Sequence, residues 1–172
     1  MSEPRLLPTI HNPHQLRRLD VEDLRALAEE LRETIIDVVS RRGGHLASNL
    51  GVAELTLALH YVFDFARDRL VWDVGHQCYA HKLLTGRQDA FQRLRQADGA
   101  GGFPAPAESA YDLFATGHAG TAISTAAGLA WADAAAGQGD RRAVAVVGDA
   151  SIGNGLSLEG LNNLASLRRQ FL

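Results

Sequence analysis

Two short apolar runs that resemble β-strands, set among segments with helical periodicity, constrain the fold of this chain more than any other feature. Leu70–Asp73 (LVWD) forms the first run, and Ala143–Val147 (AVAVV) forms the second, which leads into Gly148-Asp149. Strands that alternate with helices are typical of a parallel sheet covered by helices. We therefore expect an α/β fold, a parallel sheet flanked by helices, formed by residues 1–172 as one domain.

The helices are expected from the spacing of apolar residues and from the residues at their ends. Asp20 is a good N-cap for a helix that Gly43-Gly44 ends. Further helices are expected at 52–63, 88–95, 117–136 and 156–167. Another is expected to follow the first strand and to run through residue 82. The polar segment 9–19 is expected to be an extended arm, and 98–111 a glycine- and proline-rich loop. Phe171-Leu172 resembles the first step of another strand.

Composition and charge exclude several classes of protein. The 172 residues are 46% hydrophobic and 22% charged, which is typical of a globular chain rather than a disordered one. A net charge of −3 gives no electrostatic support for a nucleic-acid partner. No apolar run has the length of a signal peptide core or a membrane span. We expect a cytoplasmic protein with no membrane partner.

The segment Val146–Gly155 (VVGDASIGNG) is the strongest local indication of a ligand site. Asp149 follows a strand at its carboxyl end, where open α/β sheets bind ligands, and glycine turns and a helix N-terminus come next. Backbone N–H groups at such a helix end suit a diphosphate, and a carboxylate there can hold Mg²⁺. The alternative is that Asp149 only caps the helix while the glycines turn the chain, and these ten residues do not decide between the two.

Three histidines each follow a glycine at a junction that leads into a helix. They are His45, His76 and His118. Imidazoles at such positions can hydrogen-bond a phosphate or move protons near neutral pH. The alternative is three unrelated surface or capping residues, which their joint occurrence in Gly-His pairs disfavours.

Two other kinds of site are disfavoured. Cys78 is the only cysteine. It has no evident base to activate it, so a small buried thiol explains it better than a nucleophile. His76 and His81 are five residues apart, which places them on different faces of a helix and disfavours a histidine metal site.

Taken together, these segments resemble the 1-deoxy-D-xylulose-5-phosphate synthases of the transketolase superfamily. The matching strings are Thr9–Pro13 (TIHNP), Gly43–Gly51 (GGHLASNLG), Glu54–Phe63 (ELTLALHYVF), Arg69–Gln77 (RLVWDVGHQ), His81–Gly86 (HKLLTG), Gly102–Pro104 (GFP), Gly148-Asp149 and Leu161–Asn163 (LNN). They cover nearly the whole chain in order.

The resemblance implies an enzyme of the transketolase type that uses thiamine diphosphate and Mg²⁺. It implies condensation of pyruvate with glyceraldehyde 3-phosphate and release of CO₂, by a homodimer. By position, His76 would contact the cofactor and act in catalysis, and His45 would face the substrates and take part in proton transfer. Asp149 would be the first Mg²⁺ ligand. The remaining cofactor-binding positions would be Gly117, His118, Ala119, Ala150 and Ser151.

Three departures from the family pattern qualify these expectations. Ala150 stands where the family usually has glycine, and Ala119 where it usually has serine. The resemblance also implies a metal-binding asparagine after the next strand and further domains, which lie beyond Leu172. We therefore expect a truncated diphosphate-binding domain, incomplete at its C-terminus, which binds the cofactor weakly and catalyses nothing by itself. Two alternatives are the N-terminal half of a split transketolase-like enzyme and a non-catalytic remnant.

Overall fold

The computed structural model describes residues 5–167 and divides the chain into two compact units. The first unit comprises the chain up to Asp64 together with His76–Gly102. The second comprises Phe65–Gly75 and the chain from Phe103 onward. None of the helices in the described part of the chain combines the length and the apolar character needed to cross a membrane.

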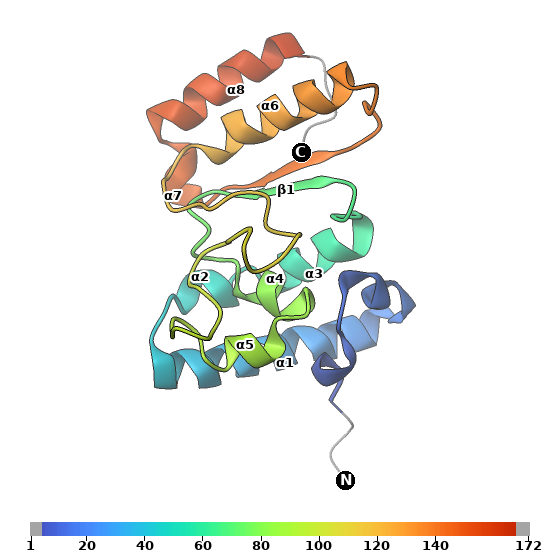
Figure 1. Ribbon diagram of the computed structural model, residues 1–172, viewed down its shortest axis with the longest axis vertical. Helices are drawn as coiled ribbons and strands as arrows, with labels where there is room; N and C mark the ends of the chain where they lie inside the picture. Colours follow the sequence, from blue (N-terminus) through green and yellow to red (C-terminus); the bar gives the residue numbers. More distant parts are fainter. Residues whose placement is uncertain (1–4, 168–172) are drawn as a thin grey trace. The chain divides into compact units, whose positions relative to one another are not determined.

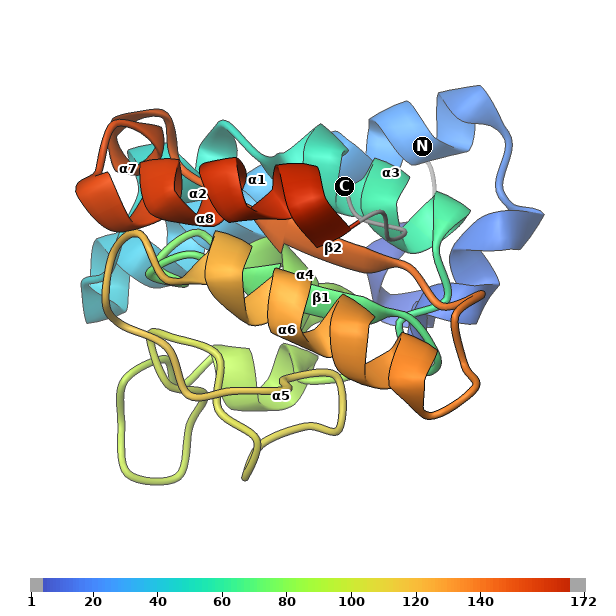
Figure 2. The same cartoon turned by 90° about the horizontal axis from the view of Figure 1, so that it is seen from above.

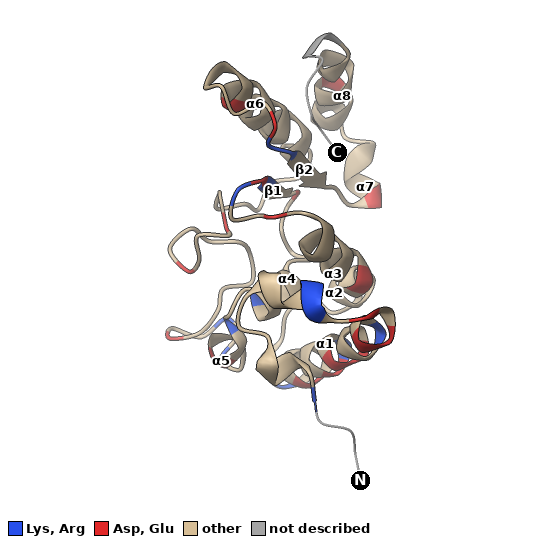
Figure 3. Ribbon diagram, turned by 90° about the vertical axis from the view of Figure 1, so that its right-hand side faces the viewer, with Lys and Arg blue, Asp and Glu red and all other residues tan. Residues whose placement is uncertain are grey.

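The long helix α1, Val21–Arg42, underlies the first unit, and it begins and ends where the sequence predicts. The Asp20 side chain accepts a hydrogen bond from the backbone N–H of Asp23 at 2.9 Å, and Gly43 follows the helix with φ +74°. Its buried apolar residues are Leu27, Leu31, Ile35 and Val38. Full burial of such a side chain is worth about 1.5–3 kcal/mol. Charged residues line much of the remaining surface of α1 (Figure 3).

Four shorter helices complete the first unit. They are α2 (Ala47–Leu50), α3 (Ala53–Val62), α4 (Tyr79–Leu84) and α5 (Gln88–Phe91). Helices α2, α3 and α4 all contact α1. Prediction and structure agree on α3, whereas α5 ends before the predicted residue 95. Arg95 has φ +62° and donates its backbone N–H to the carbonyl of Ala100 at 2.7 Å, which is incompatible with a continuing helix.

The prediction that 9–19 is an extended arm is wrong. The chain forms 3-10 helices at Leu7–Thr9 and Pro13–Arg18, and the second contacts α3. The Asn12 side chain accepts a hydrogen bond from the backbone of His14, which caps the second of these helices. Leu16 is fully buried. Ile10 and Pro13 are buried as well, so a few apolar side chains and a cap fold a segment whose composition is mostly polar.

A parallel pair of strands forms the sheet of the second unit, as predicted. Strand β1 is Arg69–Trp72 and strand β2 is Ala143–Val146, in a register that pairs Arg69 with Ala143 and Trp72 with Val146. Helix α6, Ala122–Ala135, packs against both strands (Figures 1 and 2). Their shared core consists of Val71, Ala122, Ala126, Ala130 and Ala143. The α/β fold class is therefore confirmed.

Helix α6 begins five residues later than predicted, because Gly120 has φ +85° and keeps the segment before Ala122 out of a helix. A short helix α7, Asp149–Ile152, was not predicted, and α8, Gly155–Leu167, follows it. Helices α6 and α8 lie side by side (Figure 1). The predicted strand at Phe171-Leu172 lies outside the described residues.

Helix α8 approaches α6 closely at one glycine. A Cβ atom added at Gly160 would lie 2.9 Å from side-chain atoms of both Ile123 and Ser124 on α6. Only a residue without a side chain fits between the two helices at this point.

Two buried histidines join α3 to α4 in the first unit. His60 Nε2 and His81 Nδ1 are 2.9 Å apart, and both residues are almost fully buried. Burial, the neighbouring His81 and the charge of Arg87 lower the pKa of His60 well below 6.5. Because one nitrogen of the pair must accept, the contact requires at least one deprotonated ring nitrogen.

We predict that this pair makes the stability of the chain depend on pH. The folded pKa of His60 is depressed, so below about pH 6.5 the unfolded chain takes up a proton that the folded chain does not. One such group removes up to about 1.4 kcal/mol of unfolding free energy per pH unit. Urea unfolding between pH 5 and 7 should show a flatter dependence for His60→Gln. The exposed His11→Asn serves as control, and an unchanged slope in His60→Gln would contradict the assignment.

Candidate functional site

The side chains of two predicted site histidines lie next to each other in the first unit. His45 lies in the segment between α1 and α2, and His76 lies just before α4. Their ring centroids are 5.4 Å apart, with one edge directed at the other face. The fold therefore brings together two Gly-His segments that are 31 residues apart in the sequence (76 − 45).

The surroundings of His45 favour its neutral form. Burial is the main cause that lowers its pKa below 6.5, and the nearby His76 and Arg95 lower it further. A neutral imidazole can accept a proton on one nitrogen or donate a hydrogen bond from the other. His45 is thus suited to hydrogen bonding or proton transfer near pH 7.

His76 has a ring nitrogen that the protein leaves unsatisfied. Its Nδ1 is buried and has no hydrogen-bond partner among residues 5–167. Buried polar atoms are usually paired, so each exception calls for an explanation. A ligand atom is one such explanation, and it agrees with the role predicted for His76.

Sequence reasoning missed Asn49, which fastens the two histidine segments together. Its buried side-chain amide donates hydrogen bonds to the backbone carbonyls of His45 (2.7 Å) and His76 (2.8 Å). Its oxygen accepts from the backbone N–H of Tyr79 at 2.8 Å. The residue lies within the string Gly43–Gly51, but the string itself does not indicate that Asn49 forms hydrogen bonds with the backbone of His76 and Tyr79.

The turn after β1 is held in an unusual backbone conformation. Val74 has φ +58° and Gly75 has φ +86°. The left-handed region disfavours a β-branched residue, at a cost of about 1–3 kcal/mol. A Cβ added at Gly75 would overlap the Thr116 hydroxyl, so the 116–120 segment requires glycine there.

The other predicted site residues lie in two neighbouring segments of the second unit. The segment 116–120 precedes α6, and 149–154 follows β2. A Cβ added at Gly120 would lie 2.8 Å from the side-chain carbon of Asn154, so the two segments touch. Gly117, His118 and Ala119 are therefore on a loop next to the one that carries Asp149, Ala150 and Ser151.

A buried carboxylate directly after β1 holds the first of these segments. Asp73 accepts hydrogen bonds from the backbone N–H groups of Gly120 (3.0 Å) and Ala122 (3.1 Å). It thereby caps α6 and ties it to the end of the strand. The sequence indicated Asp73 only as part of a matching string and not as a cap.

Asp149 is exposed and does not cap a helix. It is the first residue of α7, Gly148 precedes it, and its carboxylate accepts no capping hydrogen bond. Its charge in the first turn of α7 also stabilises the start of that helix. In the described part of the chain no group of three or more His, Cys, Asp or Glu side chains could hold a metal.

Thr116 adds a second unsatisfied polar atom next to a predicted site. Its hydroxyl oxygen is buried and has no hydrogen-bond partner within the described residues. It comes directly before Gly117-His118, whose residues are exposed. Cys78, in contrast, is fully buried, as predicted for a structural thiol.

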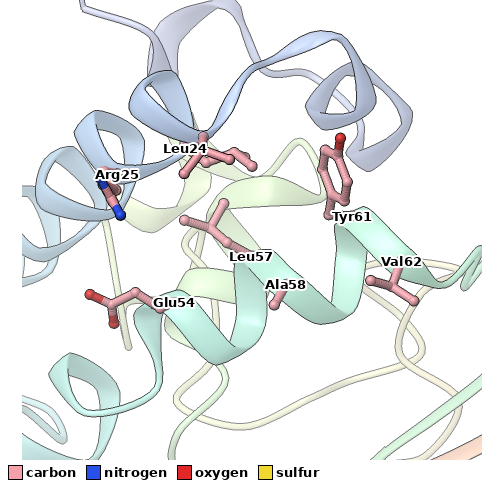
Figure 4. Close-up of a pocket in the computed structure, with 8 residues that line it drawn as sticks. Leu24, Arg25, Glu54, Leu57, Ala58, Tyr61 and Val62 are labelled. Carbon is pink, nitrogen blue, oxygen red and sulfur yellow. The ribbon is translucent and has the colours of Figure 1, made fainter.

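A separate apolar groove lies between α1 and α3 (Figure 4). It is lined by Val21, Leu24, Arg25, Glu54, Leu57, Ala58, Tyr61 and Val62. None of the predicted site residues contributes to it, and it offers few polar groups to an anionic ligand. The groove is therefore not the predicted site.

Comparison with known proteins decides the family. A family model described as 1-deoxy-D-xylulose-5-phosphate synthase matches residues 7–172. The chain belongs to this family. The sequence resemblance to these synthases is thereby confirmed.

Curated relatives of that name are similar over nearly the whole chain. One from Dechloromonas aromatica is 55% identical over 163 residues, which are 95% of this chain and 26% of the relative. One from Thiobacillus denitrificans is 58% identical over 92% of this chain and 25% of the relative. One from Caldanaerobacter subterraneus is 47% identical over 97% and 27%. The chain spans about a quarter of the length of these relatives.

We predict that Asp73 controls the order of the 116–120 segment. Asp73→Asn replaces one acceptor oxygen by an NH₂ group that faces a backbone N–H. Loss of a charge-assisted hydrogen bond costs about 1.5–3 kcal/mol, so amide exchange at Gly120 and Ala122 should accelerate about 10- to 100-fold. Exposed Asp140→Asn is the matched control. Unchanged exchange at both amides in Asp73→Asn would show that other contacts hold the loop.

Proposed function

We propose that this chain is the diphosphate-binding part of an enzyme that condenses pyruvate with glyceraldehyde 3-phosphate and releases CO₂, with thiamine diphosphate and Mg²⁺ as cofactors. The observation that carries the proposal is the contact between segments 116–120 and 149–154 in the second unit. These two segments carry an exposed carboxylate (Asp149), an exposed imidazole (His118) and several small residues. Membership of the family supports the reaction.

The second unit has the chemistry that a magnesium diphosphate requires. Asp149 offers a carboxylate to the metal, and Mg²⁺ is commonly held by one or two carboxylates with phosphate oxygens and water. Ala150 and Ser151 follow it, and α8 begins at Gly155, where the Asn154 side chain already accepts the backbone N–H of Leu156. His118 and Thr116 can donate further hydrogen bonds to phosphate oxygens. In this proposal Gly117 and Ala119 leave room for the ligand.

Ala150 adds one methyl group to the surface where, in this proposal, the ligand would lie. Ala150 is exposed, and so is Ala119. Where the family usually has glycine and serine, this chain therefore keeps small side chains on an open surface. The departures remove one hydroxyl donor but leave the backbone accessible.

The first unit would supply groups for hydrogen bonding and proton transfer. When bound, thiamine diphosphate provides a carbanion and an electron sink. The unsatisfied Nδ1 of His76 is suited to a hydrogen bond with the cofactor. The neutral His45 is suited to orient a substrate oxygen and to exchange a proton with it. We propose a cytoplasmic homodimer as the form of the whole enzyme.

Complementation distinguishes this proposal from its alternatives. The chain is mixed with a polypeptide that covers the rest of a relative's sequence, and CO₂ release from labelled pyruvate is measured. Release that requires both pieces, thiamine diphosphate and glyceraldehyde 3-phosphate supports the proposal. Transfer of a two-carbon unit from a ketose phosphate to an aldose phosphate, without CO₂ release, instead supports a split transketolase-like half. No gain at any concentration supports a non-catalytic remnant.

We predict that Asp149 sets the magnesium requirement. Asp149→Asn removes the negative charge while its shape is kept, so binding of thiamine diphosphate measured by calorimetry should need about 10-fold more Mg²⁺ or should be lost. Glu159→Gln on α8 is the matched control. Equal magnesium dependence in Asp149→Asn and in the unmodified chain would exclude Asp149 as a ligand.

A further inference from the structure

The hydroxyl group of Tyr79 contacts His45, and no function has been assigned to this contact above. Its ring is fully buried and packs edge-on against Phe91, with centroids 5.3 Å apart. Its hydroxyl oxygen accepts a hydrogen bond from the backbone N–H of His45 at 3.2 Å. The same oxygen lies 3.5 Å from His45 Nδ1. One hydroxyl therefore contacts both the backbone and the side chain of a single histidine.

The glycine before His45 is required by this contact. Gly44 has φ +139°, and a Cβ added there would lie 2.7 Å from the Tyr79 hydroxyl oxygen. Any other residue would push the chain away from the hydroxyl. The Gly-His pair that sequence analysis singled out is thus explained by the approach of Tyr79.

The hydrogen-bond roles of the hydroxyl follow from its donor count. Burial raises the pKa of Tyr79, so the group keeps its proton at neutral pH. A phenol has one proton to donate, and its oxygen already accepts from the His45 backbone. His45 Nδ1 lies 3.5 Å from the hydroxyl oxygen, at the outer limit of hydrogen bonding, and can accept that proton. A hydrogen bond in this direction leaves the ring proton of His45 on Nε2.

Asn49 fixes Tyr79 relative to the histidine segments. Its side-chain oxygen accepts from the Tyr79 backbone, and its amide donates to the carbonyls of His45 and His76. These bonds tie the start of α4 to both Gly-His segments. The Tyr79 hydroxyl is thus held at a constant distance from the His45 ring.

We propose that Tyr79 is a positioning residue for His45, which holds the imidazole in one orientation and in the Nε2–H tautomer. In this arrangement His45 presents a neutral N–H donor to an oxygen of the substrate. A neutral imidazole that donates from Nε2 can polarise a carbonyl without carrying a charge itself. The catalytic meaning of this role rests on the proposed function, but the geometric claim does not.

Tyr79→Phe tests the geometric claim without any ligand. Phenylalanine keeps the packing against Phe91 and removes only the hydroxyl. Nitrogen-15 NMR of the unmodified chain should show His45 with its proton on Nε2 and a pKa below 6.5. In Tyr79→Phe we expect the pKa of His45 to rise and the tautomer ratio to move toward that of free imidazole. His76 and Arg95, which also lower this pKa, are unchanged in the variant.

Tyr61→Phe is the matched control, because Tyr61 is on the exposed surface of α3. It should leave the pKa and tautomer of His45 unchanged, and circular dichroism should show that both variants fold. An unchanged His45 pKa and tautomer in folded Tyr79→Phe would overturn the proposal. Failed complementation would instead overturn the proposed reaction, so the two failures are distinguishable.

Asn49→Ala tests the second link. It removes the hydrogen bonds to both histidine carbonyls, so the ring-to-ring nuclear Overhauser contact between His45 and His76 should weaken or disappear. Thr56→Val is the control, since Thr56 is equally buried but donates only to the carbonyl of Val52. Loss of the contact in Asn49→Ala but not in Thr56→Val supports the positioning role. If the contact between the two rings is retained in both variants, Asn49 does not position the two histidines.

Discussion

The second unit depends on one buried carboxylate. Asp73 ends the only strand that precedes α6 in the described chain, and it accepts two backbone N–H groups at the start of that helix. The α6 N-terminus has donors that no helical carbonyl can satisfy, so a carboxylate there both pairs them and favours the helix dipole. The loop 116–120 is therefore positioned relative to the sheet and can lie against the turn that carries Asp149.

In the first unit, backbone groups of irregular segments are also paired by buried side chains, here an amide and a phenol. Asn49 pairs with three backbone groups from three segments, and Tyr79 pairs with His45. Helical packing alone would leave these irregular segments without hydrogen bonds, which is costly for buried backbone. Buried polar side chains supply these hydrogen bonds, and they thereby fix the position of the imidazoles that they contact.

Sequence patterns were reliable where local physics decides the outcome. The α1 helix follows from its apolar spacing, its aspartate cap and its terminal glycine, and β1 and β2 follow from their short apolar runs. Sequence patterns failed where a contact with a residue far along the chain decides the local conformation. The segment 9–19 looked polar, yet Leu16 is buried against a helix far along the chain. Helix α6 looked continuous from Gly117, yet the bond from Gly120 to Asp73 delays its start.

The sequence by itself determined the family and the α/β class, since strings such as GGHLASNLG and WDVGHQ indicate the family directly, and it supplied the proposed site residues. Only the tertiary structure decided which of those residues meet. It joined His45 to His76, placed 116–120 against 149–154, and assigned Asn49, Asp73 and Tyr79 their partners. The physical reason is that hydrogen bonds between residues tens of positions apart depend on the path of the backbone, which no local pattern encodes.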